Sequence, residues 1–170
     1  MNNILTSLDI RNPGLRNLPP GVERYFVKGG GLSVIEISAE DKMEIINDEG
    51  KQICEIIVFN SKGKCDLSIL NLKENGDANF SKKAISQDEK ISKLFSRKKL
   101  DINKAKSSIL FDKDCMVGEK ITLTSKDKCT VMIAAPGEAM NVHEQNPPTD
   151  LTIFLNKSKF EESEEQFLLP

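Results

Sequence analysis

Short runs in which hydrophobic and polar residues alternate fill most of the chain after residue 21. Such runs, rich in Val and Ile and separated by turn-forming residues, predict β-strands because successive side chains of a strand point to opposite faces. The second half of the run at 51–60 is almost continuously apolar, which is typical of a central strand covered on both faces. The predicted strands are 22–28, 32–38, 42–47, 51–60, 65–72, 108–111, 119–125, 129–135 and 151–156.

The segments between these strands favour turns. Residues 39–41 join two alternating runs at 34–37 and 44–47, so we expect these runs to form a hairpin. Three glycines at 29–31 precede a strand rather than a helix, and no phosphate-loop pattern can be completed around them, which predicts a turn or bulge. The fold class that follows is mainly β, with two packed antiparallel sheets in a sandwich or distorted barrel and one or two short helices in the middle.

The middle of the chain is basic, because 82–106 holds nine Lys or Arg residues and three Asp or Glu residues. Ser86 and Glu89 fit a capping box, and an apolar stripe at helical spacing follows them. The stripe consists of Ile91, Leu94 and Phe95. These features predict a helix over 87–97 with a solvated basic face. The lysines could instead attract a polyanion, although Phe95 is the only aromatic side chain there and the stripe needs it.

Length and composition indicate one globular domain with irregular ends. The 170 residues are 38% hydrophobic, enough for an ordinary core without disulfides. We expect a lead-in at 1–21, a β domain at 22–157 and an acidic linker or tail at 158–170. With 24 Lys or Arg against 26 Asp or Glu, the chain is not a generally basic nucleic-acid binder. No apolar run suits a membrane span and the start lacks signal-peptide features, so we expect a cytoplasmic protein that binds neither nucleic acid nor membrane.

Four cysteines and one histidine limit the available chemistry. The cysteines show no metal-ligand spacing, and in a cytosolic protein we expect reduced thiols used mainly in packing. They are Cys54, Cys65, Cys115 and Cys129. His143 is the only histidine, which excludes any site with two imidazoles. It lies in a polar, proline-bounded stretch that predicts a loop, where a solvated histidine is commoner than a catalytic one.

Gln52 and Glu55 are polar residues set in an apolar run, where each polar group needs a partner. In a regular strand their side chains point to opposite faces, so they would share a pocket only across a bulge. Their spacing does not identify general acid–base chemistry. The candidate substrate-binding set is Gln52, Glu55 and His143 with the loop 136–148, because histidine is the side chain that titrates near neutrality. The sequence identifies no catalytic, cofactor-binding or metal-binding residue.

Residues 44–60 resemble the opening signature of the urea carboxylase-associated family, and Gln52 matches that signature. The stretches 118–124 and 146–155 are similar to the final strands of the family, so the resemblance spans about 22–155. Members with a presumed active site carry a His-Asp pair and a Cys-rich stretch in the middle, where this chain has its Lys-rich segment. The resemblance implies a mainly β fold of two packed sheets, without those active-site residues.

The run 116–138, continued by 146–150, resembles a shortened subset of that family. Its members precede or accompany tetrahydrofolate-dependent aminomethyltransferases of the glycine cleavage T-protein type. The resemblance implies an accessory β domain or subunit in one-carbon metabolism that is not catalytic alone. Tetrahydrofolate would belong to the transferase partner, with no cofactor bound directly by this chain, and a homo-oligomer is a further option. The alternative is an enzyme acting on a carboxyguanidine-like C–N substrate, which would need a metal or a reactive thiol.

Overall fold

The computed structural model describes residues 18–137 and 147–159, which build eight strands and three short helices. The strands are β1 (Val22–Val27), β2 (Leu32–Ile37), β3 (Lys42–Asn47), β4 (Cys54–Phe59), β5 (Ser108–Leu110), β6 (Glu119–Thr124), β7 (Cys129–Ala134) and β8 (Leu151–Asn156). The helices are the 3-10 helix η2 (Leu67–Leu70), α2 (Asn79–Gln87) and α3 (Glu89–Lys98). None of the helices in these ranges is long and apolar enough to cross a membrane.

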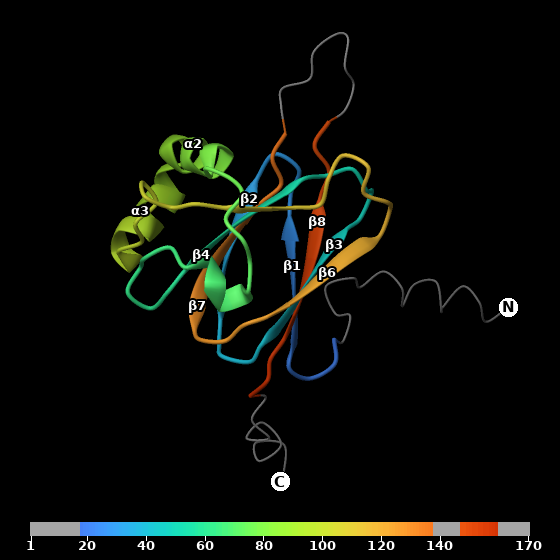
Figure 1. Cartoon of the computed structure of the whole chain (residues 1–170), viewed down its shortest axis with the longest axis horizontal. Helices are drawn as coiled ribbons and strands as arrows, with labels where there is room; N and C mark the ends of the chain where they lie inside the picture. The colour runs from blue at the N-terminus through green and yellow to red at the C-terminus, as the bar shows by residue number, and fades with distance from the viewer. Residues whose placement is uncertain (1–17, 138–146, 160–170) are drawn as a thin grey trace, which may run out of the picture.

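The strands form two antiparallel sheets of four strands each that pack face to face (Figure 1). Sheet A has the order β1-β8-β3-β6, and sheet B has the order β2-β7-β4-β5. Strands that follow one another in the chain lie in different sheets, with β4 and β5 as the exception. This strand order is that of a jelly roll. The prediction of a mainly β fold with two packed antiparallel sheets is confirmed.

Alternate residues of each strand fill the space between the sheets. In β3, Met43 and Ile45 are fully buried, whereas Glu44 and Ile46 lie on the opposite, partly exposed face. The same alternation in the other strands builds one apolar cluster between the sheets. Each large apolar side chain buried there stabilises the fold by about 1.5–3 kcal/mol relative to exposure. The interior of the jelly roll is therefore occupied by its own side chains.

The helices α2 and α3 cover the outer face of sheet B. A second apolar cluster joins Ile57 and Met132 of that sheet to Ile85 of α2 and Phe95 of α3. The ring of Phe95 meets that of Phe59 edge to face, with centroids 5.7 Å apart. Figure 1 shows both helices beside β4 and β7, away from sheet A. This cover explains why β4 is buried along its whole length, as the sequence predicts for a central strand.

Two strand predictions are wrong. The hairpin expected between 34–37 and 44–47 does not form, because β2 pairs with β7 in sheet B and β3 pairs with β6 and β8 in sheet A. The turn at 39–41 instead carries the chain from one sheet to the other. The expected strand at 65–72 is the 3-10 helix η2, because the Asp66 carboxylate caps its first turn and Asn71, with a φ of 55°, ends it.

The helical region is longer than the sequence pattern predicts. The expected helix 87–97 is α3, and its cap is Asp88, which accepts hydrogen bonds from the amides of Lys90 and Ile91, rather than Ser86. The pattern does not predict α2, because its cap residue Ala78 has no side chain that could hydrogen-bond the first turn. The first residues of the expected strand 51–60 form a connection, so β4 begins at Cys54.

Candidate functional site

Gln52 lies in the connection between β3 and β4, and its carboxamide joins three parts of the chain. The Nε2 group donates to the carbonyl oxygens of Ile53 and Pro136, each at 2.8 Å. The Oε1 atom accepts from the backbone amide of Thr149, also at 2.8 Å. With only 5% of Gln52 exposed, these bonds form in a nearly dry environment. Gln52 therefore ties the β3–β4 connection to the segments that follow β7 and precede β8.

Asn47, the last residue of β3, extends this arrangement. Its Nδ2 group donates to the Gln52 carbonyl oxygen at 2.7 Å and contacts the Cys115 sulfur at 3.3 Å. The Lys51 amide donates to the Cys115 carbonyl oxygen at 2.9 Å. Gly50, which precedes Lys51 in the β3–β4 connection, has a φ of 76°. A Cβ at this position would lie 2.7 Å from the Cys115 carbonyl oxygen, so only glycine fits. We call the group of Asn47, Gln52, Cys115, Pro136 and Thr149 the Gln52 junction.

Two oxygen atoms of the Gln52 junction are buried without a hydrogen-bond partner among the described residues. They are Oδ1 of Asn47 and Oγ1 of Thr149. Buried polar atoms of this kind usually bind an ordered water or another polar group. The junction therefore has unused hydrogen-bonding capacity in addition to the bonds that hold its segments together.

The thiols in this fold are poor nucleophiles at neutral pH. Burial, with a further contribution from the nearby Glu119, raises the pKa of Cys115 to about 11. Burial is also the main cause that raises the pKa of Cys54, Cys65 and Cys129. All four cysteines are free thiols, and Cys54 and Cys129 are buried as predicted. Because the thiolate is the reactive form, these side chains are suited to packing rather than to covalent chemistry.

Glu55 does not belong to the Gln52 junction. It is 5% exposed on β4 and points to α2, where its Oε1 accepts from the Ser81 amide at 3.0 Å and from the Ser81 hydroxyl. Gln52 and Glu55 thus contact different segments, and no hydrogen bond between the described residues links their side chains. The third predicted residue, His143, lies outside the described residues, as does most of the loop 136–148.

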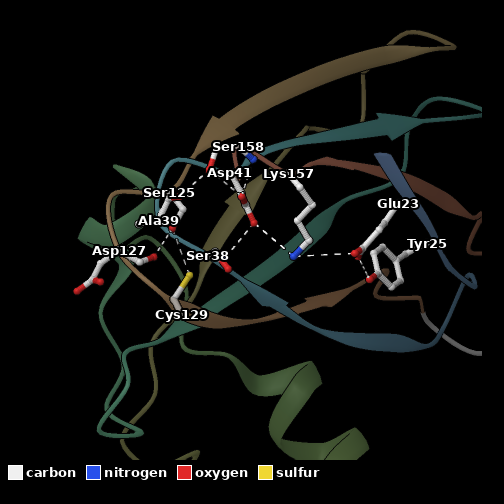
Figure 2. A network of polar contacts seen from close by, with 10 residues as sticks. All are labelled: Glu23, Tyr25, Ser38, Ala39, Asp41, Ser125, Asp127, Cys129, Lys157 and Ser158. Carbon is white, nitrogen blue, oxygen red and sulfur yellow. Dashed lines mark hydrogen bonds and ion pairs between the residues drawn. The ribbon is translucent and has the colours of Figure 1, made fainter. Parts of the chain in front are cut away.

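A second polar cluster lies at the other end of β3, around Asp41, which precedes the strand (Figure 2). Asp41, just before β3, is 1% exposed and accepts from the amides of Ser38 and Ser158, each at 2.9 Å. The ammonium group of Lys157 lies 3.4 Å from Asp41 and 3.9 Å from Glu23 of β1. We call Glu23, Ser38, Asp41, Lys157 and Ser158 the Asp41 network. It holds the end of β8 against the β2–β3 turn.

Two surface pockets lie away from both polar clusters. One, of about 220 Å³, lies between the end of α3 and sheet B and is lined by Glu36, Lys98 and Lys128, among others. The other, of about 350 Å³, lies beside η2 and includes Cys65, Glu74 and Lys104. Neither is lined by Gln52 or Glu55. The described residues contain no group of three or more His, Cys, Asp or Glu side chains that could hold a metal ion.

No protein-family model matches the sequence. A curated relative, the trimethylamine-oxide aldolase of Ruegeria pomeroyi, is 29% identical over 165 residues, which is 95% of this chain and 21% of that protein. The chain thus spans about a fifth of the length of this relative. Among solved structures, one described as the crystal structure of PirA is 10% identical, with a TM-score of 0.31 over 83% of this chain and 98% of that one. The chain is therefore similar to one segment of a much longer enzyme.

Sequence reasoning selected Gln52 but missed Asn47, Cys115 and Thr149. A signal for Asn47 is present in the sequence, because it shares the inward face of β3 with Met43 and Ile45. A polar residue at an inward position needs a buried partner. Thr149 is joined to Gln52 across 97 residues, and no local pattern reveals that contact.

Proposed function

We propose that this chain is an accessory β domain of an enzyme system of one-carbon metabolism, associated with a tetrahydrofolate-dependent aminomethyltransferase of the T-protein type. The observation that carries the proposal is that the side chains of Gln52 and Glu55 form structural hydrogen bonds within the fold. Their side chains bind backbone groups at Pro136, Thr149 and Ser81, so they hold segments of the chain in place. We infer that these two residues serve the fold and that the reactive groups belong to a partner.

The similarity to a segment of a trimethylamine-oxide aldolase supports this assignment. Trimethylamine oxide, after which this relative is named, carries methyl groups on its nitrogen. Aminomethyltransferases also act on carbon bound to an amine nitrogen. A segment of about a fifth of such an enzyme is the size expected of one domain among several. The four free thiols suit a reducing compartment, which supports the proposal of a cytoplasmic location.

We propose further that this chain has no tetrahydrofolate site of its own, and three features of the described residues support this. A ligand of that size needs a mostly apolar cleft with a few convergent polar groups. The space between the sheets is filled by the core cluster, and the Glu55 carboxylate is directed at Ser81 on α2. The two surface pockets have mainly polar and charged walls. We therefore assign the cofactor to the partner transferase.

Isothermal titration calorimetry tests the proposal. The purified chain is titrated separately with tetrahydrofolate, dimethylglycine, trimethylamine oxide and the T-protein-like transferase. The expected result is no measurable heat with the three small molecules and saturable binding of the transferase. Tight binding of tetrahydrofolate by the chain alone would contradict the accessory role, and so would a failure to bind the transferase.

The carboxyguanidine alternative predicts a bound metal or a reactive thiol. Metal analysis of the purified chain, together with Cys54→Ser, Cys115→Ser and Cys129→Ser variants assayed on a carboxyguanidine substrate, separates it from the accessory role. Under our proposal the chain holds no stoichiometric metal, and the parent and variants turn over no substrate. Turnover by the parent that any of these variants abolishes, while the variant remains folded, would establish the alternative instead.

A further inference from the structure

The outer face of sheet A is partly apolar, and the helices α2 and α3 pack on the other sheet. Phe26 of this face is 57% exposed, and Phe26, Ile46 and Phe154 belong to neither core cluster of the described residues. By contrast, the corresponding face of sheet B is covered by α2 and α3. An exposed apolar area bordered by charged residues commonly marks an interaction surface.

The strand register arranges this face in two rows centred on β8. The first row is Arg24 on β1, Phe154 on β8 and Glu44 on β3. The second row is Phe26 on β1, Thr152 on β8 and Ile46 on β3. Strands β1 and β3 flank β8 at the same spacing of about 4.8 Å. In each row, the side chains on β1 and β3 therefore lie at equal distances on either side of β8 and are chemically complementary. The first row has a cation on β1 and an anion on β3, and the second has an aromatic side chain on β1 and an aliphatic one on β3.

We propose that a second copy of this chain packs on this face, about a two-fold axis that runs along β8 between the two molecules. This rotation keeps each row and exchanges the positions of β1 and β3. Arg24 then faces Glu44 of the second copy, Phe26 faces its Ile46, and the two Phe154 rings meet at the axis. Two-fold symmetry forms the Arg24–Glu44 and Phe26–Ile46 contacts twice.

The side chains on this face are already placed for these contacts. The Arg24 guanidinium lies over the Phe26 ring, 5.0 Å from its centre, which holds the cation beside the apolar row. Glu44 is held by the ammonium group of Lys120 at 3.4 Å. Because the axis follows β8, β6 lies beyond the overlap and contributes no contact.

The size of the overlap predicts a weak dimer. Three strands of six residues cover about 14 Å by 20 Å, or roughly 280 Å² per copy, which is well below the ~800 Å² per partner of a stable interface. We therefore expect a dissociation constant on the order of 10–100 μM. Occupation of this face by other residues of the same chain would instead leave the protein monomeric at every concentration.

Sedimentation equilibrium over a wide range of protein concentrations tests the proposal. The parent chain is expected to show a monomer–dimer equilibrium. Arg24→Glu and Glu44→Arg each place like charges together twice, so each is expected to weaken dimerisation by about tenfold or more. The double variant Arg24→Glu/Glu44→Arg exchanges the charges and is expected to restore the affinity to within about threefold of the parent.

A matched pair of lysine substitutions locates the interface. Phe26→Lys places a charge in the apolar row and is expected to abolish the dimer. Thr124→Lys on β6 lies outside the overlap, opposite Lys42 rather than Glu44, and is expected to leave the dimer intact. Far-UV circular dichroism shows that each variant is folded. A parent that stays monomeric, a double charge exchange that fails to restore dimerisation, or equal effects of the two lysine variants would overturn the proposal.

Discussion

Polar groups of different kinds lie at the two ends of β3. At one end, the Gln52 junction uses neutral amides, and Gln52 binds backbone groups of three segments. At the other end, the Asp41 network uses a buried carboxylate held by backbone amides and an ammonium group. Both ends hold turns that carry the chain between the sheets. The difference is that only the Asp41 network depends on charge, so pH and salt should distinguish the two ends.

The largest expected effect is that of Gln52→Ala. This substitution leaves the Pro136 carbonyl oxygen and the Thr149 amide without their partner, and an unpaired buried polar group costs roughly 1–3 kcal/mol. We expect a loss of about 3 kcal/mol in the free energy of unfolding, measured by urea denaturation. Gln87→Ala, at the exposed end of α2, is the matched control and should change stability by less than about 0.5 kcal/mol. Equal effects would contradict the role of the Gln52 junction.

Asp41→Asn is expected to have the next largest effect on stability, and this effect should depend on pH. Burial opposes ionisation of Asp41, but the amides of Ser158 and Ser38 and the ammonium group of Lys157 lower its pKa overall. A carboxyl group with a lowered pKa in the folded state stabilises the protein above its unfolded pKa of about 3.9. That contribution is lost as the pH falls through the lower folded value.

We therefore expect Asp41→Asn to lower the stability at neutral pH by about 2 kcal/mol and to reduce the loss of stability below pH 4. Urea denaturation at a series of pH values measures both effects. Asp114→Asn, at an exposed position, provides the control. A variant that keeps the acid sensitivity of the parent would show that Asp41 does not cause it.

A smaller effect is expected for Ser81→Ala in α2. It removes the hydroxyl donor to the buried Glu55 carboxylate but keeps the backbone donor, so we expect a loss of about 1–2 kcal/mol. Ser86→Ala in the same helix removes a hydroxyl that donates to the Lys83 carbonyl at an exposed site. In thermal denaturation, the melting temperature of Ser81→Ala should therefore be well below that of Ser86→Ala. The reverse order would show that the hydrogen bond from Ser81 to Glu55 does not stabilise the fold.

The smallest effect is expected for Lys157→Met. The ammonium group is partly exposed and the backbone amides still bind Asp41, so the loss should be about 1 kcal/mol or less. It should shrink further in high salt, because salt screens partly exposed ion pairs. Urea denaturation at low and high salt gives the comparison. An effect of Lys157→Met that is unchanged by salt would mean that its charge is not what stabilises the Asp41 network.

The sequence predicts much of the fold because strand alternation is a local property. The ranges of β3 and β8 match their predictions, since each combines inward apolar residues with clear turn signals. The hairpin between β2 and β3 fails because a tight turn looks the same whether the two strands pair or enter different sheets. The helix α2 is missed because the φ of 57° at Ala78, rather than a capping side chain, marks its start.

The candidate site was only partly predictable for a related reason. Gln52 is conspicuous as a polar residue in an apolar run, but its partner Pro136 is 84 residues away and binds through its carbonyl oxygen, which every residue has. The partner of Glu55, Ser81, lies in the helix that the pattern does not predict. Long-range contacts to backbone groups leave no mark on residue type or spacing.

The most direct test of the central claim, that Gln52 and Glu55 hold the fold together and do not bind substrate, is NMR mapping of the isotopically labelled chain. The side-chain amide of Gln52 and the backbone amide of Ser81 report on the two sites. We expect tetrahydrofolate, dimethylglycine and trimethylamine oxide to leave both signals unchanged, whereas the transferase should shift surface signals. Saturable shifts of the Gln52 or Ser81 signals with any of the small molecules would contradict this claim.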